Sequence, residues 1–79
     1  MTNKRRLGQR IKAHRLLAEL SADETADQAG IPRRTYSSYE AGTREPGAIN
    51  LLKIMDVLGI SAADLLGVVD RNQELEGAR

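Results

Sequence analysis

The apolar residues of this chain recur with helical spacing from its first segment onward. Between positions 4 and 18, four residues fall on one face of a helix that turns about 100° per residue: Leu7, Ile11, His14 and Ala18. No segment alternates apolar and polar residues with the period of two that a strand requires. The pattern therefore predicts an all-α fold that begins with a helix over residues 4–18.

Capping and turn residues divide the next segment into two short helices. Ser21, followed three residues later by Glu24, has the spacing of a capping box and predicts the start of a second helix. Gly30 is expected to end that helix in the left-handed conformation. Pro32 suits the first turn of a third helix, which should end near Gly42.

Two further helices are predicted after the loop that follows residue 42. The apolar face of the fourth helix consists of Ala48, Leu51, Ile54, Met55 and Leu58. Gly59 is expected to end this helix. Ser61 with Asp64 forms a second capping box and opens a short fifth helix that carries Leu65 and Leu66.

Length and composition allow one small domain and exclude several kinds of site. A chain of 79 residues can build one core, which we expect over residues 1–69, with a polar tail over residues 70–79. The chain contains no Cys and one His, so we expect no disulfide, no metal site and no cofactor. No run reaches the roughly 18 apolar residues of a membrane span, so we expect a cytoplasmic protein without a membrane partner. No nucleophile, base and carboxylate stand at a suggestive spacing, and we expect no enzyme activity.

The charges are distributed unevenly, although the net charge is +1. Residues 1–44 hold nine basic and five acidic side chains, whereas residues 45–79 hold three basic and six acidic ones. A basic half of this kind suits a polyanionic partner. A solvated surface is the alternative interpretation of such charges.

The predicted third helix has two opposed faces. Tyr36, Tyr39 and Glu40 share one face, and the opposite face carries Arg33, Arg34, Ser37 and Ser38. A row of guanidinium and hydroxyl groups on an anchored short helix suits the DNA major groove, where Arg can donate to guanine O6 and N7. An isolated row of this kind is also compatible with an ordinary solvated surface.

Three stretches together resemble the Cro and phage-repressor class of helix-turn-helix DNA-binding domains, also called Xre-like. They are LGQRIKAHR, LSADETADQAGIPRRTYSSYEAGTREP and NLLKIMDVLGISAADLL, and they cover about three-quarters of the chain. The resemblance implies a compact five-helix, lambda-repressor-like domain that binds double-stranded DNA.

The resemblance also implies roles for individual residues. Arg33, Arg34 and Ser38 fall where family members contact base edges, with Ser37 beside them. Contacts to the DNA backbone are implied for Thr35, Thr43 and Arg44. Arg15 and Glu40 match an internal Arg and Glu that frequently pair, and His14 is expected to be partly buried rather than a ligand.

Three of the chain's departures from the family pattern concern a phosphate contact or a turn. Ala22 stands where the family often has a Gln that anchors to phosphate and braces the recognition helix. Pro32 replaces a common Ser or Thr and lacks a backbone donor. Glu19 replaces the usual Gly after the first helix, so the conformation of that turn is open.

More apolar residues are present than one small core can use. The excess residues, which we expect at a dimer interface, are Ile49, Leu52, Val57, Leu66, Val68 and Val69. The alternative is that the C-terminal tail packs on the same monomer. The sequence predicts a homodimeric, sequence-specific transcriptional regulator, a repressor that reads a palindromic operator. The rival hypothesis is a protein-binding module, such as an antitoxin whose apolar C-terminal half engages a toxin or another protein partner.

Overall fold

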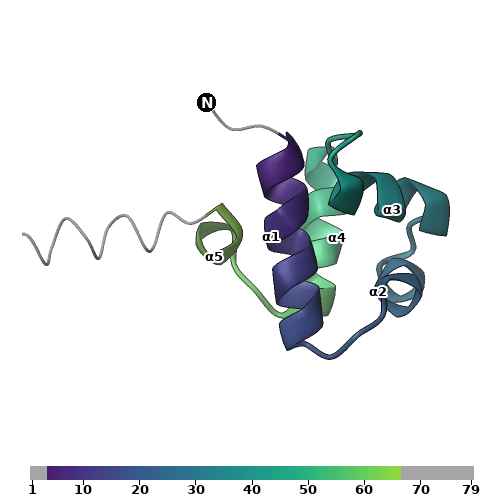
Figure 1. Ribbon diagram of the computed structural model, residues 1–79. Helices are drawn as coiled ribbons and strands as arrows, with labels where there is room; N and C mark the ends of the chain where they lie inside the picture. Colours follow the sequence, from purple (N-terminus) through teal and green to yellow (C-terminus); the bar gives the residue numbers. More distant parts are fainter. Residues whose placement is uncertain (1–3, 67–79) are drawn as a thin grey trace, which may run out of the picture.

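A computed structural model describes residues 4–66, and within this range the fold consists of five helices without strands (Figure 1). The helices are α1 (Lys4–Leu17), α2 (Ala22–Ala29), α3 (Arg33–Ala41), α4 (Ala48–Leu58) and α5 (Ala62–Leu66). The predicted all-α fold is confirmed. None of these helices has the length and apolar character needed to cross a membrane.

The predicted capping boxes define the starts of two helices. The Glu24 backbone N–H donates to Ser21 Oγ at 3.0 Å, and the Ser21 N–H donates to the Glu24 carboxylate at 2.8 Å. The same reciprocal pair joins Ser61 and Asp64 at the start of α5. Helix α3 begins at Arg33, so Pro32 lies at its N-cap, just before the first turn in which we expected it. The Pro32 carbonyl accepts the Tyr36 N–H at 2.9 Å.

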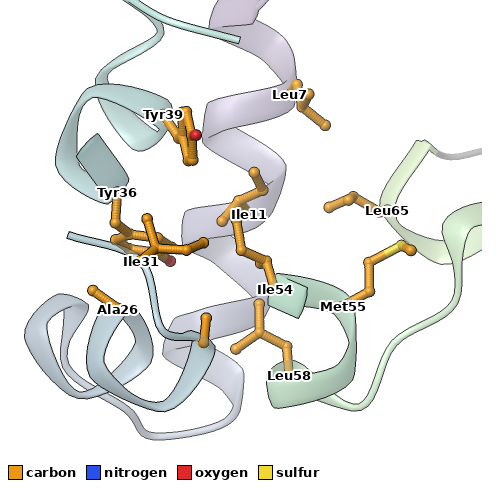
Figure 2. Packing of buried hydrophobic residues seen from close by; sticks show 11 residues of the cluster. Leu7, Ile11, Ala26, Ile31, Tyr36, Tyr39, Ile54, Met55, Leu58 and Leu65 are labelled. Atoms are coloured by element: carbon orange, nitrogen blue, oxygen red, sulfur yellow. The ribbon is translucent and has the colours of Figure 1, made fainter. Parts of the chain in front are cut away.

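Helix α1 occupies the middle of the molecule. It packs against α3 on one side and α5 on the other, while α2 packs against α3 and α4. The buried side chains join the five helices into one core, in which Ile11 and Ile54 lie between the tyrosines of α3 and Leu65 of α5 (Figure 2). The two tyrosines supply the aromatic bulk of this core, and Tyr36 is fully buried.

Gly8 allows the backbones of α1 and α3 to touch. A Cβ atom at this position would lie 2.2 Å from the Tyr39 carbonyl oxygen and 2.7 Å from that of Glu40. Real side chains do not tolerate such distances, and the obstructing atoms are backbone. The C-terminal half of α3 is therefore held directly against the first turns of α1.

Two expectations about the core are wrong. Ala18 is exposed because α1 ends at Leu17 and Ala18 lies in the following turn. Ala48 is exposed at the first position of α4. Val57 follows Ile54 by three residues, shares part of its face and is partly buried against the core. Its expected place at a dimer interface remains a prediction.

The turn after α1 contains an unusual backbone conformation. Glu19 has φ 60°, the single positive φ of a non-glycine residue among residues 4–66. This places Glu19 in the left-handed region, where its N–H donates to the Leu16 carbonyl at 3.0 Å. Glu19 thus adopts the conformation for which glycine is ordinarily used.

Candidate nucleic-acid interface

Helices α2 and α3 form a compact pair joined by a three-residue turn. Gly30, at φ 70°, donates to the Asp27 carbonyl, and the Ile31 N–H donates to the Ala26 carbonyl at 2.9 Å. Ala26 is fully buried, and Ile31 turns its side chain into the core. The small residue and the left-handed glycine let the two helices cross closely.

A buried polar cluster fixes α3 to α1. Arg15 Nε and Nη2 donate to the Glu40 carboxylate at 2.6 and 3.1 Å, and Nη1 donates to the Leu20 carbonyl at 2.8 Å. The Tyr36 hydroxyl donates to the same carboxylate at 2.6 Å. The hydrogen bonds that Arg15 donates to Glu40 raise the pKa of Arg15, while burial and then Glu40 raise the pKa of Tyr36. The opposite face of α3 is therefore presented outward.

The outward face of α3 carries the residues singled out in the sequence. Arg33, Arg34 and Ser37 are exposed, whereas Thr35 and Ser38 are half-buried. The Ser38 hydroxyl donates to the Thr35 carbonyl at 2.6 Å, so its proton is used within the helix and its oxygen can still accept. Arg33, Arg34 and Ser37 are therefore the exposed donors of this face.

A surface hollow of about 290 Å³ lies where α3 meets the loop after it. We call it the basic hollow; its lining consists of Arg34, Thr35, Ser38, Thr43 and Arg44. The backbone N–H groups of Thr43 and Arg44 donate to the Ser38 carbonyl at 3.1 and 3.3 Å, which holds the loop against the helix. The structure thus brings together residues from both sets of implied DNA contacts.

The charges of the basic hollow are not neutralised locally. The residues that line it are two arginines, two threonines and a serine, with no acidic residue among them. Within residues 4–66, neither Arg34 nor Arg44 forms an ion pair with an acidic side chain. Such a lining suits an oxygen anion, since it offers donors and positive charge together.

Arg33 has a different environment from Arg34. Its Nε and Nη2 donate to the two carboxylate oxygens of Asp27 at 3.2 and 2.8 Å, and its Nη1 donates to Asp23 at 3.3 Å. The hydrogen bond from Arg33 lowers the pKa of Asp27, and Asp27 in turn raises the pKa of Arg33. Arg33 does not line the basic hollow.

Sequence reasoning overlooked three residues at this surface. Asp23 and Asp27 lie four residues apart on α2, and their link to Arg33 depends on the turn between the helices. Arg5 lies beside the loop after α3, because a Cβ at Gly42 would come 2.6 Å from the Arg5 Cα. The basic run of residues 4–6 was the available signal for Arg5.

The predicted dimer residues are only partly within the described structure. Ile49 and Leu52 on α4 are 67% and 58% exposed, as an interface would require in the free chain. The Leu66 side chain, Val68 and Val69 lie outside what the structure describes. Leu16 and Leu17, at the end of α1, are also exposed and were not predicted as an interface. Across the described residues, no group of three or more His, Cys, Asp or Glu side chains is placed to hold a metal ion.

The fold and the α2–α3 unit define a small helical domain of the helix-turn-helix class. The family described as Helix-turn-helix matches residues 11–65, which is more than half of the chain. The chain belongs to this family.

Two curated relatives share substantial sequence identity with the chain. The cryptic phage CTXphi transcriptional repressor RstR of Vibrio cholerae is 36% identical over 72 residues, covering 89% of this chain and 64% of the relative. The SPbeta prophage-derived HTH-type transcriptional regulator YonR of Bacillus subtilis is 39% identical over 59 residues, covering 75% of this chain and 55% of the relative. The chain thus spans less than two thirds of the length of either relative.

Two solved structures share the fold. The restriction-modification controller protein C.AhdI from Aeromonas hydrophila has a TM-score of 0.75 at 29% identity, covering 78% of this chain and 94% of that one. The clp gene regulator ClgR from Corynebacterium glutamicum has a TM-score of 0.79 at 24% identity, covering 95% of this chain and 80% of that one. The second likeness supports the fold alone.

Proposed function

We propose that this protein is a sequence-specific, DNA-binding transcriptional regulator of the cytoplasm, a repressor that acts as a homodimer on a palindromic operator. The observation that carries the proposal is the basic hollow beside the exposed face of α3, where two arginines that form no ion pair within residues 4–66 lie among two threonines and a serine. The repressor role is supported by the similarity to RstR, which is named a transcriptional repressor.

The basic hollow suits a DNA phosphate, with α3 placed in the adjacent major groove. Arg44 and Thr43 lie on the loop and would hold the phosphate, whereas Arg34 lies on α3 and can also reach a base edge. Arg5 extends the positive surface beyond the loop, since it is exposed and adjoins Gly42. Phosphate contacts position a protein on DNA, and base contacts provide the specificity.

The proposed dimer rests on the exposed apolar residues of α4. Ile49 and Leu52 lie three positions apart and therefore on one side of the helix. A two-fold dimer would present two copies of α3 to successive major grooves, about 34 Å apart. Half-sites should then be centred about one helical turn from each other.

Selection of bound DNA sequences, followed by affinity measurements on arginine variants, tests the proposal. Arg34→Ala should cost about 1–3 kcal/mol at the selected site and relax the preference at particular base pairs. Arg44→Ala should weaken selected and scrambled duplexes alike and reduce the salt dependence by about one phosphate contact. Lys12→Ala is the matched control, because it removes an exposed positive charge from α1. If both arginine variants bind like the control, the basic hollow is not the DNA site.

A further inference from the structure

The Arg33 cluster, which consists of Arg33, Asp23 and Asp27, joins the two helices of the helix-turn-helix unit. Asp27 accepts two N–H bonds from the guanidinium of Arg33, and Asp23 accepts a third from the side nearer the start of α2. The guanidinium carries five N–H groups, so two remain for another partner. These three hydrogen bonds place the guanidinium of Arg33 against α2.

A contribution to folding stability does not explain why these three charged residues are paired. Arg33, Asp23 and Asp27 are all more than half exposed, and ion pairs with this exposure contribute little to folding because solvent screens them. The cluster also carries one positive and two negative charges, which is an unfavourable balance on a surface that faces a polyanion. Its effect is therefore to be sought in how Arg33 meets DNA.

A free arginine at the start of α3 could contact almost any phosphate within its reach. The carboxylates of Asp23 and Asp27 disfavour such non-specific phosphate contacts in two ways. They bind the guanidinium on the α2 side, and they repel phosphates that approach it. The two remaining N–H groups can still donate to acceptors such as O6 and N7 of a guanine. DNA with a correctly placed acceptor pair would satisfy these two N–H groups, whereas other DNA would meet the uncompensated negative charge.

We propose that Asp27, assisted by Asp23, is a specificity-determining positioning residue that aims Arg33 at a base edge and disfavours non-cognate DNA. This inference rests on the proposed function, since it requires α3 to read DNA. It also gives a function to the link between α2 and α3. Ala22, the first residue of α2, has no polar side chain that could form such a link. Asp27 acts through Arg33 and need not touch DNA.

Replacing Asp27 by asparagine tests the inference with little change in shape. Asparagine offers one acceptor oxygen, and its amide NH₂ cannot accept the second N–H of Arg33. Asp56→Asn provides a matched control, because Asp56 is an exposed acid on α4 that forms no ion pair within residues 4–66. Asp27→Glu retains the charge with a longer reach and serves as the rescue variant.

The measurement is the affinity of the full chain for a duplex selected by the wild type and for a scrambled duplex of the same composition. Asp27→Asn should strengthen binding to the scrambled duplex and reduce the ratio of the two affinities by about tenfold, as expected when one base contact loses its fixed geometry. The preference should be lost at the base pair that Arg33→Ala also affects. Asp56→Asn should change both affinities equally, and Asp27→Glu should retain most of the discrimination.

The outcomes separate this inference from the proposed function. A wild type that selects a clear motif, with Asp27→Asn selecting the same motif at the same affinity ratio, would overturn the inference and leave the proposed function standing. A wild type that selects no motif would overturn both. Thermal unfolding of each variant shows whether it is folded, and Asp23→Asn, which should reduce the ratio less than Asp27→Asn, provides a second test at the same cluster.

Discussion

Arg15 on α1 and Glu40 on α3 form a two-bond ion pair in which each side chain is 11% exposed. Glu40 also accepts the hydroxyl proton of Tyr36, so one carboxylate satisfies groups from both helices. The pair lies on the inner side of α3, away from the residues of the basic hollow. It orients the outward face without contributing to it.

Glu40→Gln should destabilise the fold without changing DNA preference. The change leaves the buried Arg15 without a charged partner, and breaking such pairs typically costs about 3 kcal/mol or more. The denaturant midpoint measures the loss, with Glu45→Gln, an exposed loop residue, as the control. A midpoint equal to that of the control would show that the pair does not stabilise the fold.

Tyr36→Phe should remove a dependence of stability on alkaline pH. The folded pKa of Tyr36 is raised above its ordinary value of 10.0 by burial and by Glu40, with Arg15 opposing the shift. The contribution of the neutral Tyr36 hydroxyl to the free energy of unfolding is therefore fully present below pH 10, and it is lost as the pH rises through the folded pKa. The difference in unfolding free energy between wild type and variant should shrink above pH 10, by up to about 1.4 kcal/mol per pH unit. A difference that stays constant from pH 8 to pH 11 would contradict the shift.

Gly8→Ala should destabilise the protein although alanine is the better helix former. The helical preference favours alanine by about 1 kcal/mol. The added methyl would meet the carbonyls of Tyr39 and Glu40 within 2.7 Å, and displacing packed backbone typically costs about 1–3 kcal/mol or more. Gly47→Ser, at an N-cap with open space around it, should be neutral or stabilising. An unfolding temperature raised by Gly8→Ala would argue against the close contact.

Glu19→Gly should stabilise the fold by about 0.5–1 kcal/mol. Glycine removes the strain of a side chain in the left-handed conformation, and this gain exceeds the loss from a more flexible unfolded chain. The same substitution at Glu45, whose φ is negative, should destabilise by a similar amount. Chemical denaturation of the two variants provides the comparison. Equal effects of the two changes would mean that Glu19 is not strained.

Leu52→Glu should convert the proposed dimer into monomers that retain their helical content. The change places charge among the exposed apolar residues of α4, whereas Leu17→Glu adds the same charge at another exposed leucine. Sedimentation should show monomers for the first variant and dimers for the second. A wild type that remains monomeric even on DNA would remove the argument for a palindromic operator.

The helices were predictable from the sequence because their ends are marked by local chemistry. Ser21, Ser61, Gly30 and Gly59 act through contacts within a few residues, and the structure confirms each of them. The end of α1 was less predictable, since Glu19 adopts a backbone conformation that its residue type disfavours.

The arrangement of the candidate site could not be derived from periodicity in the same way. The basic hollow requires α3 and its following loop to meet in space, and the Arg33 cluster depends on the angle between α2 and α3. Helical spacing places Arg33 and Arg34 on one face. It does not show that Asp23 and Asp27 pair with Arg33, or that Arg34 forms no ion pair within residues 4–66. Sequence distance is a poor guide to such contacts, because they form only after the turn at Gly30 is in place.

The close contact at Gly8 also sets the distance between the axes of α1 and α3. Because α3 rests directly on the backbone of α1 and α5 packs on the other side of α1, the thickness of one helix, about 10 Å, separates α3 from α5. In the proposed two-fold dimer, an interface on the α5 side would place that thickness twice between the two copies of α3. In that proposed dimer, a larger residue at position 8 would move α3 away from α1 and so change the DNA spacing that the two copies of α3 could span, although Gly8 itself is buried between the two helices.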